Sequence, residues 1–384
     1  MHKLQLLCKI KFSCFFLFLP KKLMILSDIS GLRLYNQKII QPSFKKSEEV
    51  LSWLGAIQGQ DYAGAKWSIG LRLVNAKETD VEDAFNRKQI LRTWLMRGTL
   101  HMVSSKDLEW MRKLFAPKII KGNARRYKEL ELDEPTLFKT NDIIIKALQE
   151  KTRLNRKELL AKIEESGIST QGQRAAYMLQ RASYDGLICQ TNTIRNVANF
   201  ILIDKSFTDG MTLDRSEAIA ELTKRYFKSR GPATIQDFVW WSGLTVAETK
   251  AGLEANKSLF CHEMIDGHSY WSPVENLPLK IARNLIHFLP GFDEFLLGYK
   301  DRSASLDPKF SNNWCPGNNG MFFPFIVMNG EVVGTWKRGF KKNVVVIEIN
   351  SFNPQKKLDE NPAILDAANK FCKFIDLTLR ISNS

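Results

Sequence analysis

Apolar residues at helical spacing define the first patterned region of the chain. They recur after Ser47, with acidic residues in the first turn, and the pattern ends near Gly59; the apolar set is Val50, Leu51, Leu54 and Ile57. A second short helix is predicted at 80–87. The stretch 90–103 then mixes β-branched, aromatic and basic residues around Gly98, as in a hairpin with one solvated face. Helix, helix and ribbon in this order predict a small winged-helix unit.

This order of elements returns in the second region of the chain. The second of three predicted helices begins with a capping box formed by Asn155 and Glu158, and the third is capped by Ser169 or Thr170. A two-stranded wing follows, with its turn at 191–192. Three helices and a hairpin form the winged variant of the helix-turn-helix, whose third helix usually enters a DNA groove.

A third such unit is drawn from 216 to 271. Gly231-Pro232 breaks its first helix. Two capping pairs open its second and third helices, Thr234 with Asp237 and Thr245 with Glu248. The units share an order of elements rather than sequence identity, which favours tandem modules over a solenoid.

Beyond 282 the pattern changes to short strands. They are predicted at 285–289, 295–299, 322–328, 331–336 and 344–349, with Asn329-Gly330 as a hairpin turn. An amphipathic helix at 362–379 would close a small antiparallel β-barrel. The predicted fold class is therefore α+β, with tandem winged-helix (helix-turn-helix) domains followed by that barrel. The predicted divisions are 1–28 a leader or mis-assigned start, 29–137, 138–210 and 211–282 the three winged-helix regions, and 283–384 the barrel.

Composition adds a strongly basic charge to this picture. The 384 residues contain 56 Lys plus Arg and 41 Asp plus Glu, a net charge of +15 that favours polyanionic partners. Residues 1–24 contribute five lysines and no acid, and we interpret the first 23 as an extension upstream of a true start at Met24, with a weak signal peptide as the alternative. The apolar run at 12–19 is too short to cross a bilayer.

The sequence lacks the usual signatures of catalysis and metal binding. It has no Walker lysine loop, GxSxG, HExxH or GxGxxG motif. The six cysteines are scattered without CxxC spacing, so neither a disulfide framework nor a zinc site is indicated and we expect a cytoplasmic protein. The four histidines beyond the leader are expected to be structural or exposed: His101, His262, His268 and His287.

One short segment stands apart, because Gln58 and Gln60 flank Gly59 where an amphipathic helix ends. Residues i and i+2 do not face each other on a regular helix, so the two glutamines can converge on one ligand only if the backbone leaves helical geometry here. On composition alone, a polar helix end is the favoured explanation of the segment.

Five strings of the sequence stand out, in this order: LGAIQGQDYAGAKWSIGLR at 54–72, LRTWLMRGTLHMV at 91–103, RGPATIQDFVWWSGL at 230–244, LPGFDEFLLGYKDRS at 289–303 and NGEVVGTWKR at 329–338. Together they resemble the AlkZ-like DNA glycosylases. The resemblance extends from about residue 29 to the end. It implies tandem winged helices followed by a β-barrel, and a family that includes enzymes that unhook interstrand crosslinks.

The resemblance also implies a site and a chemistry. The catalytic signature of the family is a QxQ motif, which Gln58 and Gln60 match. The middle residue of that motif is usually apolar and larger than the Gly59 found here. The implied reaction is hydrolysis of the N-glycosidic bond of an alkylated purine such as N7-alkylguanine. The glutamine amides would orient water beside a developing sugar cation, with no metal or cofactor. Asp61 either adds negative potential or caps the next turn, and His101 is a second supporting candidate.

Several basic residues are candidates for contacts with double-stranded DNA. Arg92 and Arg97 lie close in sequence to the motif, with a solvated strand face as the alternative; the other candidates are Arg174, Arg181, Lys337 and Arg338. A paired-carboxylate centre at Asp293 and Glu294 is considered and set aside, because strand ends and an internal salt bridge explain these acids as well.

The leading hypothesis is a monofunctional DNA glycosylase for alkylated purines or crosslinks. We expect it to act as a monomer, in the cytoplasm at the nucleoid and away from membranes. The main alternative is a non-catalytic winged-helix regulator, which would bind DNA but be indifferent to Gln58 and Gln60. A membrane protein anchored by residues 10–20 is a third reading, which fails if translation starts at Met24.

Overall fold

The computed structural model describes residues 26–383, apart from 195–196, 275–284, 354, 356–357 and 359–360. The leader predicted at 1–28 therefore lies largely outside the described residues, and its last three positions begin the first helix. Within the described part, no helix combines the length and the apolar character that crossing a membrane would need.

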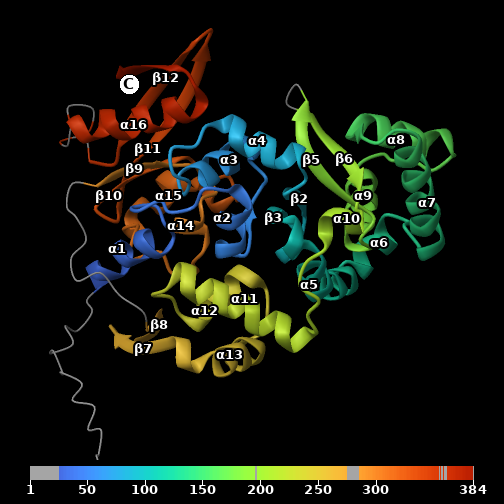
Figure 1. Cartoon of the computed structure of the whole chain (residues 1–384), viewed down its shortest axis with the longest axis horizontal. Helices are drawn as coiled ribbons and strands as arrows, with labels where there is room; N and C mark the ends of the chain where they lie inside the picture. Colours follow the sequence, from blue (N-terminus) through green and yellow to red (C-terminus); the bar gives the residue numbers. More distant parts are fainter. Residues whose placement is uncertain are drawn as a thin grey trace, which may run out of the picture.

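The first region packs short helices against a hairpin (Figure 1). Its elements are α1 (Leu26–Asn36), α2 (Ser47–Leu54), β1 (Ile57–Gln58), α3 (Tyr62–Gly70), α4 (Glu78–Asn86), β2 (Ile90–Trp94) and β3 (Leu100–Ser104). The predicted second helix and hairpin are present. The first predicted helix was extended too far, because Gly55 adopts a φ of 77° that ends α2, and the chain continues as a strand.

The second region adds helices on the outer side of that hairpin. It contains α5 (Leu108–Gly122), α6 (Ala124–Glu129), α7 (Glu134–Glu150), β4 (Leu154–Asn155), α8 (Arg156–Glu165), α9 (Arg174–Tyr184), β5 (Ile188–Ile194) and β6 (Val197–Leu202). The Asn155–Glu158 capping box is present. Two details were wrong: α9 begins after Gln173 without a side-chain cap, and 191–192 lies inside β5. The predicted division at 137/138 falls inside α7.

A six-stranded sheet joins these two regions in the order β1-β3-β2-β5-β6-β4. The junction between them is the antiparallel pair β2–β5, where Arg92 lies opposite Gln190. The short helix α10 (Lys205–Thr208) follows β6. Beneath the sheet lies the third helical group, α11 (Arg215–Arg230), α12 (Ile235–Ser242) and α13 (Val246–Ala255), with the ribbon β7 (Phe260–Ile265) and β8 (His268–Pro273). Its two predicted capping boxes are both present.

The last region is a five-stranded sheet in the order β13-β12-β11-β10-β9. Its elements are β9 (Ile286–Leu289), α14 (Glu294–Leu297), α15 (Ser311–Trp314), β10 (Phe325–Met328), β11 (Glu331–Lys341), β12 (Val344–Ser351), α16 (Pro362–Ile375) and β13 (Thr378–Asn383). The predicted closed antiparallel barrel is wrong on two counts. In the described residues β9 and β13 are edge strands that do not pair with each other, and β13 runs parallel to β12.

The strand predicted at 295–299 is also wrong, because this segment forms α14. Asp293 caps that helix by accepting a hydrogen bond from the amide of Phe295 at 2.9 Å, and all four residues of α14 are buried. A short segment that is buried on all sides is apolar throughout, whether it forms a strand or a helix. Periodicity therefore cannot distinguish the two, and the strand was predicted for this reason.

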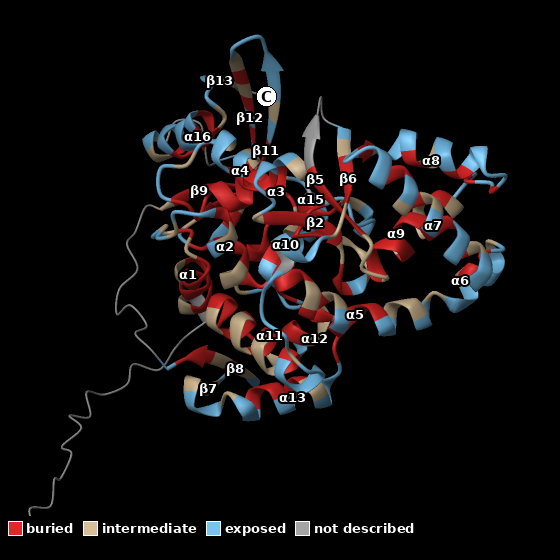
Figure 2. Ribbon diagram, turned by 45° about the vertical axis from the view of Figure 1, so that its right-hand side comes forward, coloured by how far each residue is buried: buried red, intermediate tan, exposed pale blue. Residues whose placement is uncertain are grey.

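One hydrophobic core connects the start of the chain with its end. It contains residues of α2, α3 and α4 together with residues of β9 to β12 and α16. Phe371 and Phe374 of α16 pack against the Trp67 ring of α3. Figure 2 shows this buried centre, and it shows exposed residues along α8 and at the tip of the β11–β12 hairpin. The first and last regions therefore form one folding unit.

Candidate active site

Gln58 lies on the edge strand β1, which pairs antiparallel with β3, and Gln60 follows just beyond the end of that strand. Gln58 is opposite His101 in this ladder, and the amide of Gly59 donates to the carbonyl of Leu100 at 2.8 Å. In extended backbone, residues i and i+2 point to the same side. The Gln58 Nε2 accordingly donates a hydrogen bond to Gln60 Oε1. The structure thus brings the predicted pair together, by a strand rather than by a distorted helix end.

The pair spans the boundary between the protein interior and solvent. Gln58 is buried and Gln60 is exposed. An amide group offers one acceptor oxygen and two donor hydrogens. Their mutual hydrogen bond uses a donor of Gln58 and the oxygen of Gln60, which leaves the Gln58 oxygen and the Gln60 amide hydrogens to bind a ligand.

Glu294 of α14 holds the motif strand from the interior. Its Oε1 accepts from the backbone amide of Gln58 at 3.3 Å, and its Oε2 accepts from Arg230 Nη2 at 2.7 Å and from Trp241 Nε1 at 2.8 Å. Arg230 also donates to the carbonyls of Leu54 at 2.7 Å and Ala56 at 3.2 Å. The backbone that leads into the motif is therefore fixed by buried charged groups.

Sequence reasoning missed these supporting residues. Glu294 and Arg230 stand in the strings that carry the family resemblance, but 236 residues separate Gln58 from Glu294. Asp293 also has a structural partner, because it pairs with Arg72 at 2.9 Å. Burial opposes ionisation of Asp293, and the Arg72 guanidinium outweighs it and lowers the pKa of that carboxyl. The two adjacent acids thus serve two different arginines, which agrees with setting the paired-carboxylate centre aside.

Arg92 contacts the motif directly rather than facing solvent. Its Nε donates to the carbonyl of Gly59 at 2.7 Å, and its Nη2 approaches the carbonyl of Gln60 at 3.4 Å. Its Nη1 donates to Gln190 Oε1 at 2.7 Å. Burial lowers the pKa of Arg92, against the opposing influence of Tyr62 and Asp61. Arg92 therefore ties the motif turn to β5 of the second region.

The two supporting candidates have structural contacts. Asp61 is the N-cap of α3 and accepts from the amide of Gly64 at 2.9 Å. His101 is buried, and its Nδ1 lies 2.9 Å from the carbonyl of Thr99. Burial, reinforced by the nearby Arg97 charge, lowers the pKa of His101 to about 3. The imidazole is therefore neutral at physiological pH and lacks the acidic second proton that a general acid would give to a leaving group.

The remaining basic candidates differ in availability. Arg97, at a φ of 55° in the β2–β3 turn, has its guanidinium 5.5 Å from the Trp240 ring centre. Lys337 is exposed on β11, and Arg338 lies 5.6 Å from the Phe371 ring. Arg174 donates to the carbonyl of Ser169 at 2.8 Å, and Arg181 is buried between Glu134 at 2.7 Å and Asp185 at 2.9 Å. Protein groups already occupy Arg174 and Arg181, so we do not propose these two residues as DNA contacts.

The geometry as a whole fits an acceptor–donor site without metal ligands. Across the described residues, no group of three or more His, Cys, Asp or Glu side chains is placed to hold a metal ion. What converges at β1 is a pair of neutral amides, with charged groups held behind it. Such a site can position a water molecule or a polar group of a substrate.

Comparison with known proteins gives a consistent picture. The model of a family described as DNA glycosylase AlkZ-like matches residues 51–374. An interstrand DNA cross-link repair glycosylase of Streptomyces sahachiroi is 23% identical over 322 residues, which are 77% of this chain and 82% of that protein. The solved structure of Streptomyces sahachiroi DNA glycosylase AlkZ aligns with a TM-score of 0.75 over 94% of this chain and 100% of that one, at 19% identity.

Proposed function

The chain belongs to the AlkZ-like family of DNA glycosylases, and from this premise we propose that it hydrolyses the N-glycosidic bond of N7-alkylated purines in DNA. The observation that carries the proposal is the hydrogen-bonded pair Gln58–Gln60 at the solvent boundary of β1. The similar Streptomyces sahachiroi protein is named for interstrand cross-link repair, and we extend the proposed substrates to crosslinked purines on that likeness.

In the proposed reaction, the two amides orient a water molecule. N7-alkylation makes the purine cationic, so departure of the base neutralises a charge and needs no strong general acid; the neutral state of His101 is consistent with this. The bond from the anomeric carbon to the base nitrogen breaks, the water oxygen bonds to that carbon, and its proton is released to solvent. Because water is the nucleophile, the enzyme is monofunctional and leaves an abasic site.

We propose that the helical groups are tandem winged helices that hold duplex DNA. The order of three helices followed by a hairpin in α7–α9 with β5–β6, and again in α11–α13 with β7–β8, supports this reading. The proposed regions are those predicted above, with the first division moved ahead of α7. Arg97 and Lys337 are the proposed DNA contacts, and a monomer at the nucleoid is the proposed working form.

An excision assay tests the glycosylase. The purified chain is incubated with duplexes that carry N7-methylguanine or a nitrogen-mustard crosslink, and alkali then cleaves any abasic sites. Gln58→Ala and Gln60→Ala are expected to abolish lesion-dependent cleavage while DNA binding persists. The matched control Gln149→Ala, at an exposed position of α7, should cleave like the native chain. Binding without cleavage of either lesion would instead favour the non-catalytic regulator.

A further inference from the structure

Three arginines are partly desolvated and form no ion pair with a carboxylate in the described part of the chain. Elsewhere, buried arginines face acids: Arg72 pairs with Asp293, and Arg230 pairs with Glu294. Burial lowers the pKa of Arg92, Arg97 and Arg302, and in the described part of the chain none of these three has an ion pair within 4.0 Å. Removing a charge from water without a partner costs free energy, and a bound ligand of opposite charge offsets that cost.

Arg302 is held in a fixed orientation by two indole rings. Its guanidinium carbon lies 4.8 Å from the Trp240 ring centre and 5.3 Å from that of Trp314. Its Nε donates to the carbonyl of Leu296 at 3.0 Å, and its Nη1 approaches the carbonyl of Lys300 at 3.4 Å. No hydrogen bond from Nη2 is found within the described residues. The group is therefore oriented, charged and left with donors to spare.

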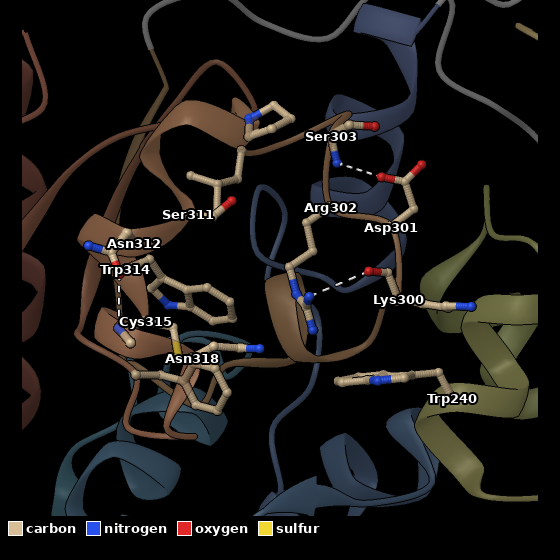
Figure 3. A pocket seen from close by; sticks show the side chains of 14 residues that line it. Trp240, Lys300, Asp301, Arg302, Ser303, Ser311, Asn312, Trp314, Cys315 and Asn318 are labelled. Atoms are coloured by element: carbon tan, nitrogen blue, oxygen red, sulfur yellow. Dashed lines mark hydrogen bonds between the residues drawn. The ribbon is translucent and has the colours of Figure 1, made fainter.

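Arg302 lines a cavity of about 650 Å³ between α12 and α15 (Figure 3). Further polar groups line the same space: Lys300, Ser303, Ser311, Asn312 and Asn318. Asp301, also at the wall, is turned toward Ser303, whose amide donates to its Oδ1 at 2.9 Å. Cationic and hydroxyl or amide groups around a planar guanidinium match the donors that bind phosphate oxygens.

One side chain, Trp240, connects the cavity to the turn between β2 and β3. The Trp240 ring is 4.8 Å from the guanidinium of Arg302 and 5.5 Å from that of Arg97. Arg97 lies in the turn that joins β2 to β3, the strand that pairs with the motif. Two guanidinium groups that form no ion pair within the described residues therefore flank one indole, which also lines the cavity.

We propose that Arg302 binds a backbone phosphate of the DNA in this cavity. The inference rests on the proposed function only because it takes DNA as the ligand. The site would bind the phosphodiester backbone whether or not the DNA carries a lesion. Arg302 is a binding residue that fixes the register of the strand and takes no part in bond cleavage.

The test measures binding of undamaged duplex DNA as a function of salt. Neutralising one phosphate contact lowers the slope of log affinity against log salt by about one. Arg302→Gln should therefore bind DNA more weakly than the native chain. The ratio of the two affinities should shrink about threefold between about 50 and about 200 mM salt. Arg125→Gln is the matched control, because it removes the same charge at a position 92% exposed on α6. If Arg302→Gln gives the slope of this control, the phosphate site is wrong.

A second variant guards against loss of folding at Arg302. Asn318→Asp places a carboxylate at the cavity wall without removing a packed group, and Asp tolerates the φ of 51° at this position. The new acid should compete with phosphate for Arg302 and reproduce the reduced slope; an unchanged slope in Asn318→Asp overturns the proposal. Since the readout needs no lesion, a chain that fails to excise bases but shows these slopes refutes the glycosylase and leaves the phosphate site standing.

Discussion

At the scale of single residues, Gly59 shows how closely the motif lies against its neighbour strand. A Cβ at this position would lie 3.3 Å from both the backbone nitrogen and the Cγ of Met102. The side chain of Met102 can move, but its backbone is held in the β2–β3 ladder. The larger residue that is typical of the family at this position would require β1 and β3 to separate slightly.

Gly59→Ala is therefore expected to lower the free energy of unfolding by about 1–3 kcal/mol, the usual range for overpacking a tight contact. Urea denaturation measures the change. Gly122→Ala is the matched control, because a Cβ there meets nothing within 4 Å. A Gly59→Ala stability equal to that of the native chain would show that β1 relaxes freely.

His101 makes stability depend on pH. Its pKa in the folded protein is about 3, below the ordinary histidine value of 6.5, so between these values the unfolded chain binds the additional proton. Stability is therefore lost as pH falls below 6.5, by about 2 kcal/mol between pH 7 and pH 5. Urea denaturation at the two pH values should show a smaller loss for His101→Gln, whereas an identical loss would mean that His101 is protonated in the fold.

At the scale of elements, local signals predicted what local contacts determine. The capping boxes at Asn155, Thr234 and Thr245 involve residues three apart, and each begins a helix as predicted. The strand β1 was missed because its two residues depend on β3 and on buried groups from distant segments. The open sheet was missed because pairing of β12 with β13 follows a crossover through α16, which no turn motif announces.

Two substitutions at Asp61 distinguish its role as the cap of helix α3 from a role of its negative charge in the site. Asp61→Asn keeps a capping oxygen and removes the charge, so it should retain stability and, if capping is the role, excision activity. Asp61→Ala should lose about 1 kcal/mol of stability, because the amide of Gly64 loses its partner. Thermal unfolding and the excision assay on both variants distinguish the roles: loss of excision in Asp61→Asn would assign the residue to electrostatics.

At the scale of the whole molecule, a buried ion pair joins the first region of the fold to the last. Arg72 of the first region and Asp293 of the last are both fully buried, and the guanidinium also donates to the carbonyl of Gln37 at 3.0 Å. Such contacts between residues 221 apart are invisible to periodicity and turn chemistry. This is why sequence patterns predicted the order of elements better than the surroundings of the motif.

Asp293→Asn should lower the free energy of unfolding by about 3–5 kcal/mol, because it leaves the Arg72 charge buried without a counterion. Denaturation followed by tryptophan fluorescence measures the loss. Asp366→Asn, an exposed change of the same chemistry on α16, should leave stability within about 0.5 kcal/mol of the native value. If both variants have the same free energy of unfolding as the native chain, the Arg72–Asp293 pair contributes nothing to stability.

The hydrogen bond between the Gln58 amide and Glu294 also orders events during synthesis. A ribosome releases the chain from its N-terminus, so the motif emerges 236 residues before the carboxylate that holds it. The nascent chain can form its early helices, but β1 acquires its full set of partners only after residue 294 has left the exit tunnel. A message truncated upstream of that codon therefore encodes a protein in which the glutamine pair is never locked in place.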